Sequence, residues 1–159
     1  MHKVIFLDID GVLNSQSWLD TKGFVYPYKI PEHEKFDPKA VKILSKIIYL
    51  TDAKIIFSST WRLDFSSQEL AKMIREFAPF PPRTFGGCTP DLKLKENRGD
   101  EIELFIKDKG KSISSYCILD DAPIDKFTKP QIKNHLVSTD YDRGLKQKHI
   151  TEVIRVLKS

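Results

Sequence analysis

The chain has 159 residues, 40% apolar and 30% charged, so it has the length of one domain and enough apolar material for a core. Two cysteines without a CxxC pair, and four histidines without metal-ligand spacing, exclude a disulfide-rich scaffold and a thiolate zinc centre. The net charge of +4 is uneven: residues 1–125 carry 18 Lys/Arg and 19 Asp/Glu, whereas residues 126–159 carry 8 and 3. A basic excess confined to the C-terminal fifth permits a polyanionic partner without requiring one.

Short apolar runs alternate with amphipathic stretches along the chain. Runs of three or four consecutive apolar residues suit strands that are buried on both faces, as in parallel sheets. In chain order the pattern predicts a strand at 4–7, a helix at 38–51, a strand at 55–57, a helix at 66–77, a strand at 84–87, a helix at 98–109, strands at 116–119 and 135–137, and a helix at 150–157. This alternation predicts an α/β fold with a three-layer, doubly wound, Rossmann-like parallel sheet.

Two long segments interrupt the alternation. Residues 14–36 are irregular and aromatic, and residues 79–97 are rich in proline and glycine. Long loops in compact α/β domains usually frame a site. We therefore expect a single domain over residues 1–159, in which 14–36 form a flap-like loop insertion.

Targeting signals are also missing from the pattern. The longest apolar runs are only four or five residues, far shorter than a membrane span. Asp8 follows the first apolar run directly, which is incompatible with a secretory leader. We expect a cytoplasmic protein with no membrane partner.

Three of the predicted strands end in acids or hydroxyls. Asp8 and Asp10 follow the first strand, Ser58 to Thr60 follow the second, and Asp120 and Asp121 end the strand at 116–119. Ligands of open parallel sheets bind at the carboxyl ends of the strands. Several carboxylates gathered there repel each other unless a cation is present, and carboxylate oxygens without His or Cys suit Mg²⁺. A magnesium ion with few protein ligands in turn suggests a phosphate substrate.

These motifs, in this order, resemble the haloacid-dehalogenase-type (HAD) phosphohydrolases. Residues 8–14, DIDGVLN, are similar to the first motif of that family, FSST at 57–60 to the second, and LDD at 119–121 to the fourth. Asp125 lies at the spacing of a further acid of the fourth motif. The DGVLN, SSTWR, RGDEI and LDD segments look similar to small members without a large cap domain, some of which are attached to RNA-repair proteins.

The resemblance implies a role for each acid. Asp8 would attack phosphorus and form an aspartyl-phosphate, and Asp10 would protonate the leaving oxygen and then activate water. Magnesium would bind Asp8, the carbonyl group of Asp10 and Asp121, while Asp120 orients its neighbour and Asp125 holds a metal-bound water. Asp8, Asp10, Asp120, Asp121 and Asp125 are thus the expected metal group.

The phosphate contacts are implied in the same way. Ser59 would donate to a phosphate oxygen, with Thr60 assisting, and Gly11 would allow the turn beneath the metal. Arg98 is our choice for the cation of the third motif because it would sit at the start of a helix, and the alternatives are Lys93 and Lys95. The family usually has Thr where Val12 stands, so one hydroxyl is absent near the site.

Aromatic residues after the second motif and in the 14–36 segment have two interpretations each. Trp61 either packs a helix onto the sheet, which we favour, or the substrate is framed by Trp61 or by Arg62. Phe24, Tyr26 and Tyr28 either anchor their loop or stack on a base.

The expected function is Mg²⁺-dependent hydrolysis of a phosphomonoester. An open site without a cap suits a nucleotide, a nucleic-acid end or another large phosphorylated substrate. The alternatives are a catalytically idle HAD-fold module that binds nucleic acid or phosphoprotein, and a phosphotransferase that uses an acceptor other than water. The intact pair of Asp8 and Asp10 argues against the idle module, because binding alone requires neither a nucleophile nor an acid.

Overall fold

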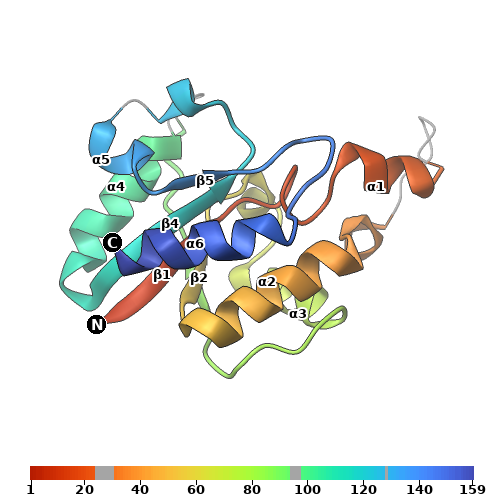
Figure 1. The fold of residues 1–159 in the computed structure, drawn as a ribbon, viewed down its shortest axis with the longest axis horizontal. Helices are drawn as coiled ribbons and strands as arrows, with labels where there is room; N and C mark the ends of the chain where they lie inside the picture. The colour runs from red at the N-terminus through yellow and green to blue at the C-terminus, as the bar shows by residue number, and fades with distance from the viewer. Residues whose placement is uncertain (24–30, 94–97, 128) are drawn as a thin grey trace.

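A five-stranded parallel sheet forms the centre of the molecule (Figure 1). The computed structural model describes residues 1–23, 31–93, 98–127 and 129–159. The strands are β1 His2–Leu7, β2 Lys54–Phe57, β3 Phe85–Cys88, β4 Ile113–Asp120 and β5 Leu136–Ser138, and their order in the sheet is β3-β2-β1-β4-β5.

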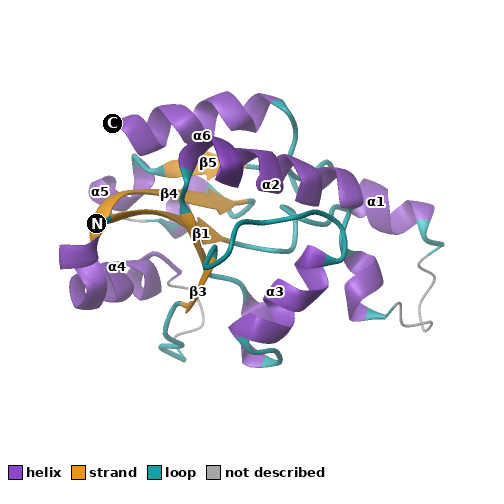
Figure 2. Ribbon diagram, turned by 90° about the horizontal axis from the view of Figure 1, so that it is seen from below, coloured by secondary structure: helices purple, strands orange, loops and turns teal. Residues whose placement is uncertain are grey.

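Helices connect the strands and cover both faces of the sheet. They are α1 Gln16–Thr21, α2 Pro38–Thr51, α3 Ser67–Arg75, α4 Arg98–Lys109, α5 Pro130–Lys133 and α6 Lys148–Lys158, with short 3₁₀ turns that include η1 Glu32–Lys35, η2 Thr60–Leu63 and η4 Ile124–Lys126. Figure 2 shows α2 and α6 on one side of the strands and α4 on the other. This arrangement confirms the predicted three-layer α/β fold.

The alternation of side chains along β1 explains the two-sided core. Ile5 and Leu7 face the layer of α2, α3 and α6, whereas Val4 and Phe6 face the layer of α4 and α5, and all four are buried. A strand that points apolar side chains to both faces is stable only between two helical layers. The continuous apolar run therefore places β1 in the middle of the sheet.

The chain reverses its direction across the sheet beside β1. It runs outward from β1 through β2 to β3, then crosses to β4 and β5 on the other side of β1. Leu7 at the end of β1 pairs with Phe57 of β2 and with Leu119 of β4, so the three strands end at the same level. The gap between β1 and β4 is the switch point at which open α/β sheets bind ligands.

Capping residues define where two of the helices begin. The side chain of Asp37 accepts a hydrogen bond of 2.8 Å from the amide of Lys39, and Pro38 occupies the first turn of α2. Ser66 and Glu69 form a reciprocal capping box at the start of α3. Both starts agree with the predicted helices.

Two expectations about loops were wrong. Residues 14–36 are not irregular throughout, because α1 lies within them, and α5 forms where no helix was expected. Neither shows an amphipathic pattern: α1 has no buried residue and α5 is only four residues long. Phe24, Tyr26 and Tyr28 lie outside the described residues, so the flap-like role of this segment stays a prediction.

Candidate active site

Three carboxylates meet at the switch point of the sheet. Asp8 directly follows β1, Asp120 is the last residue of β4, and Asp121 comes next. One oxygen from each lies within 4.8 Å of the others. Because the ends of β1 and β4 are in register, two segments more than 110 positions apart deliver their acids to one place, as the sequence predicted.

The guanidinium of Arg98 lies between two of these acids. Its Nη1 atom is 2.6 Å from Oδ2 of Asp8 and 2.6 Å from Oδ2 of Asp120. The second oxygen of Asp8 accepts 2.8 Å from the amide of Ile9, and that of Asp120 accepts 2.8 Å from the amide of Ala122. Both carboxylates are therefore held in fixed orientations.

Burial dominates the electrostatics of these acids. The pKa of Asp8 is raised from 3.8 to about 6: burial is the largest cause and the charge of Asp120 the second, while Arg98 and a hydrogen bond from Ser59 oppose the rise. Burial also raises the pKa values of Asp120 and Asp121. For Arg98, burial alone would lower the pKa, but the carboxylates of Asp8 and Asp120 outweigh it and raise the pKa above its usual range. The three acids thus share one cation, and a further positive charge beside them would stabilise their ionised forms.

Arg98 is the first residue of α4, at the place where the sequence expectation put it. Of the two alternative cations, Lys95 lies outside the described residues. Lys93 is exposed in a turn in which its backbone amide bonds to the Asp91 side chain at 2.8 Å. Among the described residues, the cation that contacts Asp8 is therefore Arg98.

Gly11 makes room for Asp121. Its φ is +72°, in the left-handed region, and a Cβ atom built on it would lie 2.1 Å from Oδ2 of Asp121. No other residue type can combine that backbone conformation with that separation. The glycine expected from the sequence is thus a spatial requirement of the acid that faces it.

Two neutral donors hold the carboxylate of Asp10. Nδ2 of Asn14 donates to Oδ1 at 2.8 Å, and the indole Nε1 of Trp61 donates to Oδ2 at 3.0 Å. Asn14 also accepts 3.0 Å from the amide of Gly11, so it ties the acid to the backbone of its own turn. The sequence analysis assigned neither contact; the only sequence signal is that Asn14 lies four residues after Asp10.

Trp61 is a core residue, as we favoured, and it also makes a polar contact that was not expected. Its side chain is 8% exposed and packs against Phe36 and Phe65, with ring centroids 5.3 and 5.9 Å away. Its one polar atom nevertheless reaches Asp10 at the site. The ring is a core residue that presents its N–H group to the active-site acid.

The end of β2 contributes Ser59 and Thr60. Ser59 is fully buried, caps η2 by accepting from the Trp61 amide at 3.4 Å, and bonds to the Asp8 carboxyl. Thr60 is exposed and lines a cavity next to Asp10. The serine therefore lies beside the acid cluster and the threonine beside open space.

Arg62 points away from that space. Its Nη1 donates to the carbonyl oxygen of Ser59 at 2.7 Å, and its Nη2 forms a 2.7 Å ion pair with Glu101 of α4. The two charged side chains are 7% and 10% exposed. The pair joins the Ser59 turn to the helix that carries Arg98. In this structure Arg62 therefore has a structural role: it links two elements of the site. The sequence analysis did not identify Glu101.

Asp125 is separated from the acid group. It lies on η4 and is exposed, and the three-acid group found among the described residues does not include it. The four-residue spacing from Asp121 therefore does not bring this carboxylate to the cluster in the structure.

The segment after β5 fastens the turn that follows Asp8. Thr139 Oγ1 donates to the carbonyl oxygen of Gly11 at 2.8 Å, and the amide of Leu145 donates to that of Val12 at 2.9 Å. Gly144, with φ of +66°, allows the close approach, since a Cβ there would lie 3.1 Å from the Val12 oxygen. The turn that follows Asp8 is thus bound to a segment some 130 residues later.

The acid group fits a hard divalent cation. Three carboxylates share one guanidinium, which leaves a formal excess of two negative charges if all are ionised. Asp8 is 4% exposed and Asp120 is fully buried, so little water reaches them to offset that charge. Oxygen ligands without His or Cys are the donors that Mg²⁺ prefers.

Fold and site together define a Rossmann-like domain of the HAD type, with an acid cluster at the switch point of a parallel sheet. The chain belongs to the family described as the HAD domain in Swiss Army Knife RNA repair proteins, whose model matches residues 4–150. No curated protein and no solved structure matches the chain. Among the described residues, no helix has both the length and the apolar character needed to cross a bilayer.

Proposed function

We propose that this chain is a magnesium-dependent phosphomonoesterase that acts through an aspartyl-phosphate on Asp8, with a nucleotide or a polynucleotide end as substrate. The observation that carries the proposal is the placement of Asp8 within 4.8 Å of Asp120 and Asp121, beside Arg98 and Ser59. The family, found in RNA-repair proteins, supports a phosphorylated nucleic acid as the partner.

In the proposed first step, an Asp8 carboxylate oxygen attacks phosphorus and the bond from phosphorus to the leaving oxygen breaks. The proton of Asp10 goes to that oxygen, so an alcohol leaves and an acyl phosphate remains. In the second step, water attacks phosphorus, Asp10 takes its proton, and the Asp8–phosphorus bond breaks to release inorganic phosphate.

The other site residues act on the phosphoryl oxygens or on the acids. Arg98 and the hydroxyl group of Ser59, which both contact Asp8, would donate to the phosphoryl group while it is bound to Asp8. Trp61 and Asn14 hold the Asp10 carboxylate by two hydrogen bonds, which fixes where its proton is delivered.

Magnesium would be held by Asp8, Asp121 and the carbonyl group of Asp10, and Asp120 would orient the neighbouring Asp121. Bound there, it would neutralise charge on the phosphoryl oxygens and on the acid cluster. Asp125 is not one of the three grouped acids, so we place it outside the primary ligands.

The test is phosphate release with Mg²⁺ and with EDTA. The substrates are p-nitrophenyl phosphate and oligoribonucleotides phosphorylated at the 3′ or the 5′ end. We expect Mg²⁺-dependent release that falls at least about 10³-fold in Asp8→Asn. Asp108→Asn, an exposed acid of α4, is the matched control. Full activity of Asp8→Asn, or no release from any phosphomonoester, would contradict the proposal.

A trapping experiment separates hydrolysis from the alternatives. With Asp10→Asn and ³²P-labelled p-nitrophenyl phosphate, whose leaving group departs without a proton, we expect the protein to become labelled and hydroxylamine to release the label, because the water-activating group is gone while the nucleophile remains. Faster loss of label on adding an alcohol, with the phosphate recovered on the alcohol, would indicate a phosphotransferase. Salt-sensitive oligonucleotide binding without label or turnover would indicate a binding module.

A further inference from the structure

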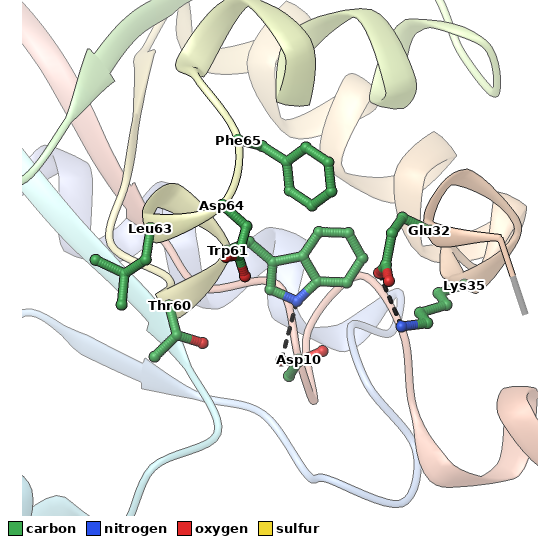
Figure 3. A pocket seen from close by; sticks show the side chains of 8 residues that line it. All are labelled: Asp10, Glu32, Lys35, Thr60, Trp61, Leu63, Asp64 and Phe65. Carbon is green, nitrogen blue, oxygen red and sulfur yellow. Dashed lines mark hydrogen bonds and ion pairs between the residues drawn. The ribbon is translucent and has the colours of Figure 1, made fainter. Parts of the chain in front are cut away.

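A cavity of about 490 Å³ opens on the side of the site where Asp10 lies (Figure 3). Its walls include Trp61, Leu63 and Phe65 on one side and the η1 residues Glu32 and Lys35 on the other. The volume falls in the range of about 300–1,000 Å³ that is typical of small-molecule sites.

The position of Asp10 decides which part of a substrate can reach this cavity. In the proposed reaction, Asp10 delivers its proton to the leaving oxygen, so the leaving group lies on the Asp10 side of phosphorus. Asp8 and its acid neighbours do not line the cavity. The cavity is therefore open to the alcohol portion of the ester, while the phosphoryl group stays with Asp8.

We propose that this cavity is the leaving-group subsite and that it takes the terminal nucleoside of the phosphate ester, with both its sugar and its base. This inference rests on the proposed function and adds the specificity that the acid cluster alone does not supply.

The apolar part of the lining suits a base. Leu63 is 58% exposed, and it lies on the same 3₁₀ turn as the exposed Thr60. Phe65 is only partly buried, and Figure 3 shows its ring beside that of Trp61 at the cavity wall. Covering Leu63 and Phe65 with a flat, weakly polar ring removes apolar surface from water.

The charges in the lining select against a second phosphate. Asp10, Glu32 and Asp64 are acidic and Lys35 is basic, which gives the lining a formal net charge of −2. Lys35 is already paired with Glu32 at 2.8 Å and lies 5.7 Å from the centre of the Trp61 ring. Carboxylates accept hydrogen bonds from hydroxyl and amino groups, which a nucleoside offers, and they repel phosphate.

This chemistry is shared by a free mononucleotide and by the end of a nucleic-acid strand. In the second case, the next phosphodiester must lie outside the cavity. A comparison of a ribonucleoside 5′-monophosphate with short 3′- or 5′-phosphorylated oligoribonucleotides distinguishes these sources. Methyl phosphate is the control for the cavity, because its methyl group is too small to cover Leu63 and Phe65.

The first variant removes apolar lining. We expect Leu63→Ala to lower the ratio of kcat/KM for the mononucleotide to kcat/KM for methyl phosphate by about 5- to 20-fold, mainly through KM. Leu50→Ala is the matched control, since Leu50 is 57% exposed on α2 and does not line the cavity.

The second variant changes the charge of the lining. Glu32→Gln frees Lys35 and makes the cavity less negative, so kcat/KM for a nucleoside 3′,5′-bisphosphate should rise about 2- to 5-fold relative to the monophosphate. Glu34→Gln, on the same turn but outside the lining, should leave that ratio as it is in the wild-type protein.

Two outcomes are decisive. If methyl phosphate is hydrolysed as well as the nucleotides, and Leu63→Ala behaves like Leu50→Ala, the subsite is refuted while the phosphatase function stands. If no ester is hydrolysed, the function fails, and calorimetric binding of a ribonucleoside to wild type and Leu63→Ala tests the cavity alone. Binding weakened by the variant supports the subsite, and equal or absent binding overturns it.

Discussion

Removing the charge of Asp8 should make the metal-free protein more stable. The side chain is 4% exposed, and its pKa is raised from 3.8 to about 6, chiefly by burial. In the unfolded chain the same carboxyl ionises near its ordinary value. Between these two pH values the folded state binds more protons, so the free energy of unfolding falls as pH rises from about 4 to about 6.

The size of the effect follows from the two pKa values. The difference between 3.8 and about 6, at about 1.4 kcal/mol per pH unit, amounts to about 3 kcal/mol against folding once Asp8 is ionised. Asparagine keeps the shape without the charge, and Arg98 keeps its 2.6 Å contact with Asp120. We expect Asp8→Asn to raise the free energy of unfolding at pH 7.5 by about 2–3 kcal/mol.

The assay is urea unfolding and thermal unfolding in EDTA, at pH 4 and at pH 7.5. At pH 7.5 the variant should melt about 5–10 °C above the wild-type protein, and at pH 4 most of that gain should vanish because wild-type Asp8 is then protonated. Asp108→Asn, which alters an exposed acid, should change neither value by more than about 0.5 kcal/mol. Saturating Mg²⁺ should stabilise the wild-type protein more than Asp8→Asn.

Two results would refute this reasoning. The first is an Asp8→Asn variant that is no more stable than wild type at pH 7.5 in EDTA. The second is a gain of equal size at pH 4 and pH 7.5, which would show that the gain comes from packing rather than from charge.

Three further predictions concern the surrounding structure. Gly11→Ala should destabilise the fold by about 1–3 kcal/mol and abolish the Mg²⁺-induced rise in Tm, because its Cβ would lie 2.1 Å from an Asp121 oxygen. Arg62→Leu should lower the free energy of unfolding in urea by about 3–5 kcal/mol, because it leaves Glu101 buried and unpaired. Adding Glu101→Leu should restore most of this loss. A double variant as unstable as the single one would contradict the ion-pair explanation. The His149 side chain is buried, and its pKa is lowered, chiefly by burial. As the pH drops below about 6.5, the unfolded state therefore binds a proton that the folded state does not, and the free energy of unfolding should fall. In His149→Asn the loss of stability between pH 7.5 and 5.5, measured by urea unfolding in EDTA, should be smaller. An unchanged pH profile would show that His149 is not the cause of the loss.

The sequence predicted those features that depend on local pattern or on parallel topology. Asp37 and Pro38 mark a helix start by chemistry that acts over two or three residues. Asp8 and Asp120 meet because any two parallel neighbouring strands bring their carboxyl ends together. In both cases the physical cause is visible without knowledge of the packing.

Other features depend on contacts that no local pattern encodes. Arg62 follows the second motif directly, which suggested a role at the substrate, yet its partner Glu101 lies 39 residues further along the chain. The Trp61 indole reaches Asp10 across 51 residues, so its preference for the core and its polar contact become visible together only in the folded structure. Helix α1 escaped prediction because none of its residues is buried, so it lacks the apolar stripe by which amphipathic helices are recognised.

The contacts of Thr139 and Leu145 with the turn around Gly11 have a consequence for how this protein is made. Every acid of the cluster has been synthesised once residue 121 is complete, but the segment that fastens the catalytic turn follows some twenty residues later. A chain that stops after β5 would carry the full set of acids and lack the clasp that holds Gly11 in place. We therefore expect the proposed phosphatase activity to appear late in synthesis and to be lost in C-terminal truncations that leave every acid of the cluster intact.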